Sequence, residues 1–441
     1  MHSITPLRFR AQYLDQMFCF LQVLSDSQNH CVMRLGGRID GQRLARAVRL
    51  LIDAEPIAGS RYVERWWKAY WERPGEIEPG SLLRVVETAD GEAALRSFLL
   101  EKPDLARGPL VTVRVFRGPK DTVCLKMHHT LGDGGGLSEL CRLMAAFYRK
   151  LLDDPSFEPE PNREGDRSTR QVYRSLDVRD RMRLWGGGRD AHPGRAFKIW
   201  SFPLCAGPGT PLIVQRTVEP ESFEAIREYG KARGAGVNDV ILTAYHRALH
   251  AVVRPEPELR LRIALPFDWR RFLPEGRAGA VCNLLGVIHS DIGHDLGNDF
   301  DATLSRVHQD MEARKRDLSG LRGLPLQESL CRVLPYRVVK RRITSNFHRL
   351  ARDGNTRGNR IATPGLSNAG ALDPLALEFG DVEVENAFFP GPVHYPPCFT
   401  LVLTSFRGRM TFTVRSLDSG ANRSRIEHFF ELFEKELSQC Q

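Results

Sequence analysis

Two adjacent histidines, His128 and His129, are followed by three residues and then by Asp133 and Gly134. An imidazole titrates near neutral pH, so it can take a proton from a weak nucleophile and return it to a leaving group. Neighbouring side chains on an extended chain point to opposite sides. We therefore expect one of the two histidines to face a substrate cavity while the other supports it.

The residues on either side of this stretch predict the elements that position it. Alternating apolar residues indicate a strand over 110–116 and a return strand over 123–127, joined by a turn at 118–121. Apolar residues at helical spacing then predict a helix over 137–151. The histidines therefore lie at the end of a strand, where loops often carry catalytic residues.

Upstream, the apolar spacing predicts one helix over 8–24, a strand over 30–38 and a helix over 40–53 that Asp40 caps. An aromatic run follows at 62–71 and contains three tryptophans. We expect this run to pack in the core between lobes, with a cover over an acyl channel as the alternative.

The chain has 441 residues, which is long for one compact core and suits two domains. Its formal net charge of +9 favours anionic partners, although a solvated basic surface is the simpler interpretation. The sequence lacks nucleic-acid-binding motifs and regularly interleaved aromatics, so we expect no nucleic-acid partner. The sequence is compatible with peripheral contact with a membrane surface.

The nine cysteines are odd in number, and none form a CxxC pair. This usage predicts neither a disulfide framework nor a zinc site and favours a reducing, cytoplasmic location. We also expect no metal at the histidines, because adjacent histidines on a strand cannot readily point at one ion. The apolar stretch at 17–24 is too short to span a bilayer.

The pattern changes over 153–195, where prolines, charged residues and Gly186-Gly187-Gly188 leave no lasting periodicity. We therefore divide the chain into a first lobe at 1–155, a linker or crossover with one short helix at 156–200, and a second lobe at 201–441. In the second lobe, the apolar spacing predicts a strand over 212–218 and helices over 221–233 and 240–253.

The stretch from His128 to Gly134 matches the HHxxxDG signature and so resembles the acyl-CoA-dependent acyltransferase superfamily. That superfamily includes chloramphenicol acetyltransferase and the condensation domains of peptide synthetases. Further segments resemble the family in the family's order, with Cys282 standing where a glycine would be expected: 237–244, 266–271, 283–286 and 367–370. The resemblance implies a mixed α/β fold of two chloramphenicol-acetyltransferase-like lobes, with the active site between them in a monomer.

The resemblance also implies roles for the motif residues. His129 would be the general base, and His128 would be structural or line the pocket. Asp133 could orient His129, as the acid of a catalytic triad does, or pair with an arginine and hold the loop. The family favours the second role, with Arg270 as the expected partner and Arg271 as the alternative.

A tetrahedral intermediate would also need donors for its oxyanion. The backbone N–H of Gly134 or Gly135 could serve, as could side chains of the second half, and the sequence does not choose among them. These substrate-pocket candidates are Asn283, Ser367 and Asn368.

The family's donor is a phosphopantetheine thioester, and no tightly bound cofactor is expected. The thioester would be acyl-CoA or an acyl-carrier protein, and the acceptor a small-molecule alcohol or amine. A basic segment over 332–360 could bind CoA phosphates, a carrier helix or anionic lipid, or could be a solvated face. The alternatives to a stand-alone acyltransferase are a free-standing condensation enzyme using carrier-bound substrates and a catalytically silent scaffold.

Overall fold

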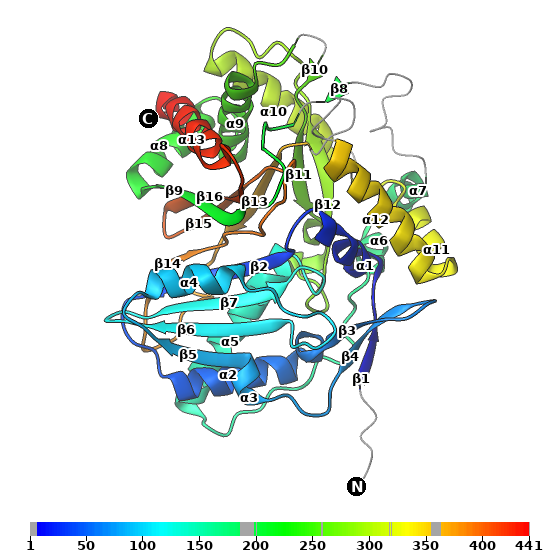
Figure 1. The fold of residues 1–441 in the computed structure, drawn as a ribbon, viewed down its shortest axis with the longest axis vertical. Coiled ribbons are helices and arrows are strands. Elements are labelled where there is room, and N and C mark those ends of the chain that lie inside the picture. The colour runs from blue at the N-terminus through cyan, green and yellow to red at the C-terminus, as the bar shows by residue number, and fades with distance from the viewer. Residues whose placement is uncertain are drawn as a thin grey trace.

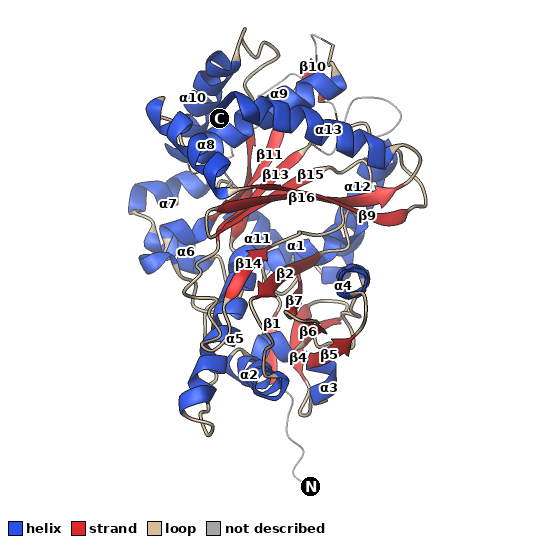
Figure 2. Ribbon diagram, turned by 90° about the vertical axis from the view of Figure 1, so that its left-hand side faces the viewer, coloured by secondary structure: helices blue, strands red, loops and turns tan. Residues whose placement is uncertain are grey.

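The computed structural model describes residues 7–185, 198–199, 201–256, 259–316, 318, 320–353 and 363–440. Two large sheets form the centres of two lobes, which lie one above the other in Figure 1. Figure 2 shows the same two layers after a quarter turn, with helices on the outer side of the upper sheet. The predicted architecture, two lobes that each contain a mixed sheet flanked by helices, is confirmed.

The first lobe contains a five-stranded sheet in which only β5 and β6 are parallel. The alternating valines of β6 are buried, which is why this apolar pattern forms a central strand. The predicted hairpin is confirmed, because β6 and β7 pair as antiparallel neighbours. In spatial order the strands are β14 (Val384–Phe388), β2 (Gln28–Leu35), β7 (Thr122–His128), β6 (Val111–Arg117) and β5 (Leu83–Glu87).

Helices complete the first lobe. The N-cap predicted at Asp40 is confirmed, since its carboxylate accepts hydrogen bonds from the N–H groups of Gln42 and Arg43. Leu44, Val48 and other apolar residues of that helix form its buried stripe. The helices are α1 (Tyr13–Phe20), α2 (Gly41–Ala54), α3 (Pro79–Leu82), α4 (Gly91–Leu100) and α5 (Gly134–Asp153).

A small three-stranded sheet corrects two predictions. The region over 8–24 is not one helix, because residues 7–10 form a strand that pairs with β4 before α1 begins. The aromatic run at 62–71 divides, since Trp71 is buried whereas Trp66 and Trp67 are exposed at the tip of a hairpin. The sheet consists of β1 (Leu7–Arg10), β4 (Ala69–Arg73) and β3 (Arg61–Glu64).

The second lobe contains a six-stranded sheet whose outer face is covered by helices, seen at the top of Figure 1. Between sheet and helices, Tyr245, Phe399 and Phe429 pack edge to face or stacked. The strands in order are β12 (Leu285–Ser290), β11 (Ile263–Asp268), β13 (Gly365–Ala371), β15 (Thr400–Phe406), β16 (Arg409–Asp418) and β9 (Thr210–Val218). The helices are α8 (Pro220–Ala232), α9 (Val237–Val253), α10 (Phe300–Arg316) and α13 (Asn422–Leu437).

Between the lobes lie further helices, on the right of Figure 1. The segment predicted as a linker with one short helix contains two in its described part, α6 (Arg170–Ser175) and α7 (Val178–Trp185). Two more follow in the second half, α11 (Leu324–Val333) and α12 (Tyr336–Asp353). Two short strands, β8 (Lys198–Ile199) and β10 (Leu259–Arg260), pair in parallel. No helix in the described ranges is long and apolar enough to cross a membrane.

One strand crosses from the second half of the chain into the first sheet. β14 pairs with β2, and the chain then returns to the second lobe through an isolated bridge between Ser25 and His394. The division at 1–155, 156–200 and 201–441 stays a prediction, to which the structure adds this exchanged strand.

Candidate active site

The HHxxxDG stretch spans the turn between β7 and α5. β7 ends at His128, and α5 begins at Gly134 with Asp133 as its N-cap. The backbone N–H of His128 donates to the carbonyl of Leu110 at 3.0 Å, and that of His129 donates to the carbonyl of Ser27 at 2.8 Å. The turn is therefore held by main-chain hydrogen bonds to two neighbouring segments.

His128 is buried and plays a local part in the turn. Its Nδ1 accepts a hydrogen bond from the N–H of Thr130 at 3.1 Å, which requires an unprotonated nitrogen. Burial, and then the neighbouring His129, lower the pKa of His128 to about 3. His128 is therefore neutral at physiological pH and supports the loop.

His129 is partly buried, and its ring lies against that of Phe18 in α1. The two rings are stacked, with centroids 3.8 Å apart and planes inclined by 14°. Burial lowers the pKa of His129, although its own backbone, the charge of Asp133 and the amide of Asn283 oppose that shift. The imidazole is thus held neutral, which is the form that can accept a proton.

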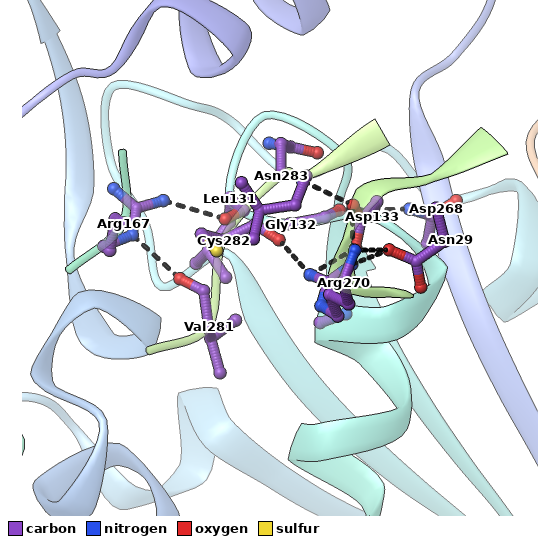
Figure 3. A network of polar contacts seen from close by, with 12 residues as sticks. Asn29, Leu131, Gly132, Asp133, Arg167, Asp268, Arg270, Val281, Cys282 and Asn283 are labelled. Carbon is purple, nitrogen blue, oxygen red and sulfur yellow. Dashed lines mark hydrogen bonds and ion pairs between the residues drawn. The ribbon is translucent and has the colours of Figure 1, made fainter. Parts of the chain in front are cut away.

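Asp133 is buried, and its carboxylate is directed at the second lobe (Figure 3). It forms an ion pair with Arg270 at 2.8 Å and accepts hydrogen bonds from the N–H groups of Leu284 at 2.7 Å and Gly136 at 3.0 Å. Burial would raise the pKa of Asp133, but the charge and hydrogen bonds of Arg270 and these N–H groups lower it. No hydrogen bond joins Asp133 to His129 in the described part of the chain, so the carboxylate holds the loop.

Arg270 belongs to a short 3₁₀ turn after β11 and joins the lobes. Its guanidinium also donates to the carbonyl of Cys282 at 2.9 Å and to Asp268 at 3.1 Å. Gly135 makes this approach feasible, because a Cβ at that position would lie 2.6 Å from Nη1 of Arg270. The alternative partner, Arg271, lies instead over the rings of Phe267 and Phe272.

The candidates for the oxyanion and pocket divide into two groups. The amide of Asn283 donates to the carbonyls of His129 and Thr130, both at 3.1 Å, so it lies in the histidine turn. Ser367 and Asn368 lie on β13, where the side chain of Asn368 bonds to Asn238. Within the described residues, neither shares a hydrogen bond with the turn.

The backbone N–H groups of Gly134 and Gly135 begin helix α5, and no described residue accepts a hydrogen bond from either of them. A Cβ on Gly134 would meet nothing within 4 Å, so this side of the helix start is open. A cavity of about 360 Å³ lies beside this turn of α5, lined by groups from both lobes that include Gly135, Arg142, Arg270, Arg277 and Leu377.

Arg167, from the predicted linker, is a buried site residue that the sequence did not reveal. Its guanidinium pairs with Asp15 of α1 at 3.0 Å and donates to the carbonyls of Leu131 at 2.9 Å and Val281 at 2.8 Å. The indole of Trp71 donates to the same carboxylate. Arg167 thus ties the histidine turn to α1 and to the second lobe. In the sequence it is one of many charged residues in the linker, and nothing there distinguishes it from the others.

His394 is the second residue that sequence reasoning missed. It lies on the return from β14 to β15, and its N–H donates to the carbonyl of Arg415 at 3.1 Å. Burial, the proximity of His129 and that of Arg415 lower the pKa of His394 to about 4. A neutral imidazole from the crossover therefore lies near His129, and no motif around residue 394 signalled it.

Comparison with solved structures identifies the fold, although no protein-family model and no curated protein sequence matches the chain. The first condensation domain of the calcium-dependent antibiotic synthetase has a TM-score of 0.68 at 16% identity, covering 98% of this chain and 96% of that one. Polyketide synthase associated protein 5 from Mycobacterium tuberculosis has a TM-score of 0.68 at 14% identity, covering 99% and 100%. A trichothecene 15-O-acetyltransferase from Fusarium sporotrichioides has a TM-score of 0.71 at 11% identity, covering 98% and 96%.

The chain has the two-lobed fold of condensation domains and of this acetyltransferase. At these identities the similarity establishes the fold alone.

Proposed function

We propose that this condensation-like protein transfers an acyl group from a phosphopantetheine thioester to a hydroxyl or amine, with His129 as general base. The observation that carries the proposal is the state of His129. Its imidazole is held neutral between the lobes, and the neighbouring carboxylate of Asp133 is occupied by Arg270. A neutral imidazole in such a position can accept a proton from an attacking nucleophile.

In the proposed reaction, the acceptor oxygen or nitrogen attacks the thioester carbonyl carbon while His129 takes its proton. The carbon–sulfur bond then breaks, and the imidazolium returns the proton to the thiolate. The N–H groups of Gly134 and Gly135 stabilise the oxyanion, since both start a helix and have no acceptor within the described residues. Base catalysis of this kind typically contributes about 10²- to 10⁴-fold in rate.

The proposed donor is either acyl-CoA or an acyl-carrier protein. One similar structure is a condensation domain of a synthetase, whereas another is an acetyltransferase. The second candidate is therefore a free-standing condensation enzyme that uses carrier-bound substrates and forms an amide or ester.

The test is thiol release, followed with a colorimetric thiol reagent. The protein is given acyl-CoA donors and acyl-loaded carrier proteins, each with and without alcohol and amine acceptors. Acceptor-dependent release that falls by at least about 100-fold in His129→Ala would support the proposal. His428→Ala is the matched control, because His428 is an exposed histidine on α13. A folded protein that releases no thiol from either donor class would contradict acyl transfer and favour a silent scaffold.

A further inference from the structure

Two tryptophans are exposed at the tip of the β3–β4 hairpin, on the right of Figure 1. Trp66 is 55% exposed and Trp67 is 62% exposed. Their carbonyls accept hydrogen bonds from the N–H groups of Arg337 at 3.2 Å and Tyr336 at 3.1 Å. The hairpin tip is thus fixed against the start of α12.

Helix α11 presents an apolar stripe to the outside at this place. Leu326, Leu330 and Val333 recur at spacings of four and three, which places them on one face of the helix. All three are exposed, Val333 by 77%. Helices of globular proteins normally bury such a stripe in the core. Together with Leu334 and Val338, these side chains and the two tryptophans form a surface that we call the apolar face: Trp66, Trp67, Leu326, Leu330, Val333, Leu334 and Val338.

Helix α7 extends this pattern. Val178, Met182 and Trp185 are exposed at the same helical spacing. The carbonyl of Leu184 accepts a hydrogen bond from the N–H of Gly323 at 2.9 Å, so α7 ends beside the start of α11. α7, α11, α12 and the hairpin tip all lie on the right-hand side of Figure 1, and each carries exposed apolar residues, which is more than single scattered surface residues would give.

The charge at the edge of the apolar face is positive. Arg337, Arg341 and Arg342 are exposed on α12, and none has a carboxylate partner within the described residues. The guanidinium of Arg337 lies 6.0 Å from the ring of Trp66. The one acidic residue of α11, Glu328, is buried. Unpaired arginines beside exposed aromatic and aliphatic side chains complement a surface that is anionic and apolar.

We propose that the apolar face docks on an anionic membrane surface. Tryptophan favours the headgroup region of a bilayer, where its ring is partly apolar and its N–H remains hydrated. Aliphatic stripes insert to a shallow depth beside it, and arginines pair with lipid phosphates. An acidic carrier protein would also be attracted by the arginines, but charge alone does not account for two exposed tryptophans and an aliphatic stripe. This docking does not depend on the proposed chemistry, so it can fail or succeed independently.

The experiment is co-sedimentation of the whole chain with vesicles. One set contains equal parts of phosphatidylcholine and phosphatidylglycerol, and the other contains phosphatidylcholine alone. We expect binding to the anionic vesicles that weakens as salt is added. The double variant Trp66→Ala/Trp67→Ala should bind about tenfold more weakly. Leu330→Ser should weaken binding, whereas Leu375→Ser, at an exposed leucine outside the apolar face, should not.

The arginines are tested by reversing their charge. Arg337→Glu/Arg341→Glu/Arg342→Glu should lose at least about tenfold in affinity for the anionic vesicles. The matched control reverses three exposed basic residues that lie outside the apolar face and have no ion pair within the described residues: Arg46→Glu, Arg96→Glu and Lys231→Glu. It changes the net charge by the same amount and should keep most of the binding.

Unchanged thermal melting would show that each surface variant is folded. Three outcomes would overturn the docking proposal. The first is that the wild-type protein is absent from both vesicle pellets. The second is that the control variant loses as much binding as the arginine variant. The third is that binding to an immobilised acidic carrier protein depends on the apolar face while vesicle binding does not. Loss of acyl transfer in His129→Ala would bear on the proposed function and leave vesicle binding intact.

Discussion

The protonation state of His129 sets the acid side of the expected pH profile. Burial lowers the pKa of His129 below the ordinary value of 6.5, so the neutral base persists to a lower pH than a free imidazole would allow. We expect kcat/KM for acyl transfer to be level through neutral pH and to fall only below about pH 6.5. Initial rates of thiol release across a pH series measure this dependence of kcat/KM on pH. A fall that begins above about pH 6.5 would contradict the neutral state proposed for His129.

Asp133 gives a prediction about stability as well as activity. Asp133→Ala leaves the buried guanidinium of Arg270 without its charge partner, which typically costs about 3–5 kcal/mol. Asp133→Asn keeps the shape and should cost less. Both should lower activity and stability together, as urea unfolding and thiol release would show. Asp133→Ala with wild-type stability but no activity would mean that the carboxylate acts directly on His129.

The stabilising contribution of the Asp133 carboxylate depends on pH. The pKa of Asp133 is lower in the folded protein than in the unfolded chain, because Arg270 and the N–H groups of Leu284 and Gly136 together outweigh the effect of burial. Its stabilising contribution is therefore present above the unfolded value of about 3.9 and is lost as the pH falls through the lower folded value. Since Asp133 also raises the pKa of His129, Asp133→Asn should move the acid limb of kcat/KM to lower pH.

Phe18 is predicted to position the imidazole. Its ring stacks on His129 with centroids 3.8 Å apart, where it fixes the imidazole plane and would stabilise the imidazolium of the proposed transfer. Phe18→Leu should reduce kcat by about tenfold, less than the loss expected when the base itself is removed. Phe18→Tyr retains the aromatic face and is the control. Equal losses in both variants, or a matching loss of thermal stability, would contradict a positioning role.

At the scale of the element, α5 depends on glycine at its second position. A Cβ on Gly135 would meet the guanidinium of Arg270 at 2.6 Å, whereas one on Gly134 would meet nothing within 4 Å. Gly135→Ala should therefore displace Arg270 and lower the free energy of unfolding by about 1–3 kcal/mol. Gly134→Ala should melt at or above the wild-type temperature, because alanine favours the helix. Equal melting of both variants would show that Arg270 can move freely.

The elements around the motif could be predicted because their patterns are local. The β6–β7 hairpin and the capped helix α2 follow from alternation, helical spacing and an N-cap residue. The pairing of Asp133 with Arg270 followed from the cost of a buried charge and from resemblance to the family. The strand at 7–10 was missed because its few residues also fit a helical spacing, and its partner β4 lies far along the chain.

The parts that could not be predicted are those fixed by long-range contacts. Arg167 is one of many arginines in a charged segment, and only the fold brings it to Asp15 and to the carbonyls of Leu131 and Val281. The exposure of Trp66 and Trp67 likewise depends on where the hairpin tip docks. Composition cannot reveal either, because tryptophan is usually only partly buried and arginine is rarely buried unless it is paired.

At the scale of the whole molecule, a buried arginine side chain connects the two lobes at the crossover. β14 of the second half lies in the first sheet, and Arg415 of β16 is fully buried where the chain returns. Its guanidinium donates to the carbonyls of Leu99 and Gly391 and lies 3.9 Å from the carboxylate of Asp26. The guanidinium of Arg415 therefore contacts the first lobe and the crossover from a strand of the second lobe.

Arg415→Met tests this connection. It leaves the buried carboxylate of Asp26 without a cation, so we expect a loss of about 3–5 kcal/mol in urea unfolding. The double variant Asp26→Asn/Arg415→Met should lose less than the sum of the single variants, because the uncompensated charge is then absent. Burial already raises the pKa of Asp26, with Arg415 opposing it, so removing Arg415 raises that pKa further.

Removing Arg415 should also make the stability of the protein depend on pH. In Arg415→Met, the folded protein holds a proton on Asp26 that the unfolded chain releases above about pH 3.9. The stability deficit of Arg415→Met relative to the wild-type protein should therefore shrink as the pH is lowered towards that value and grow towards neutral pH. Urea unfolding midpoints of both proteins, measured at about pH 4 and at neutral pH, give this deficit at the two ends of the range. A deficit that does not change with pH would mean that Arg415 acts through its hydrogen bonds to Leu99 and Gly391 and not through its charge.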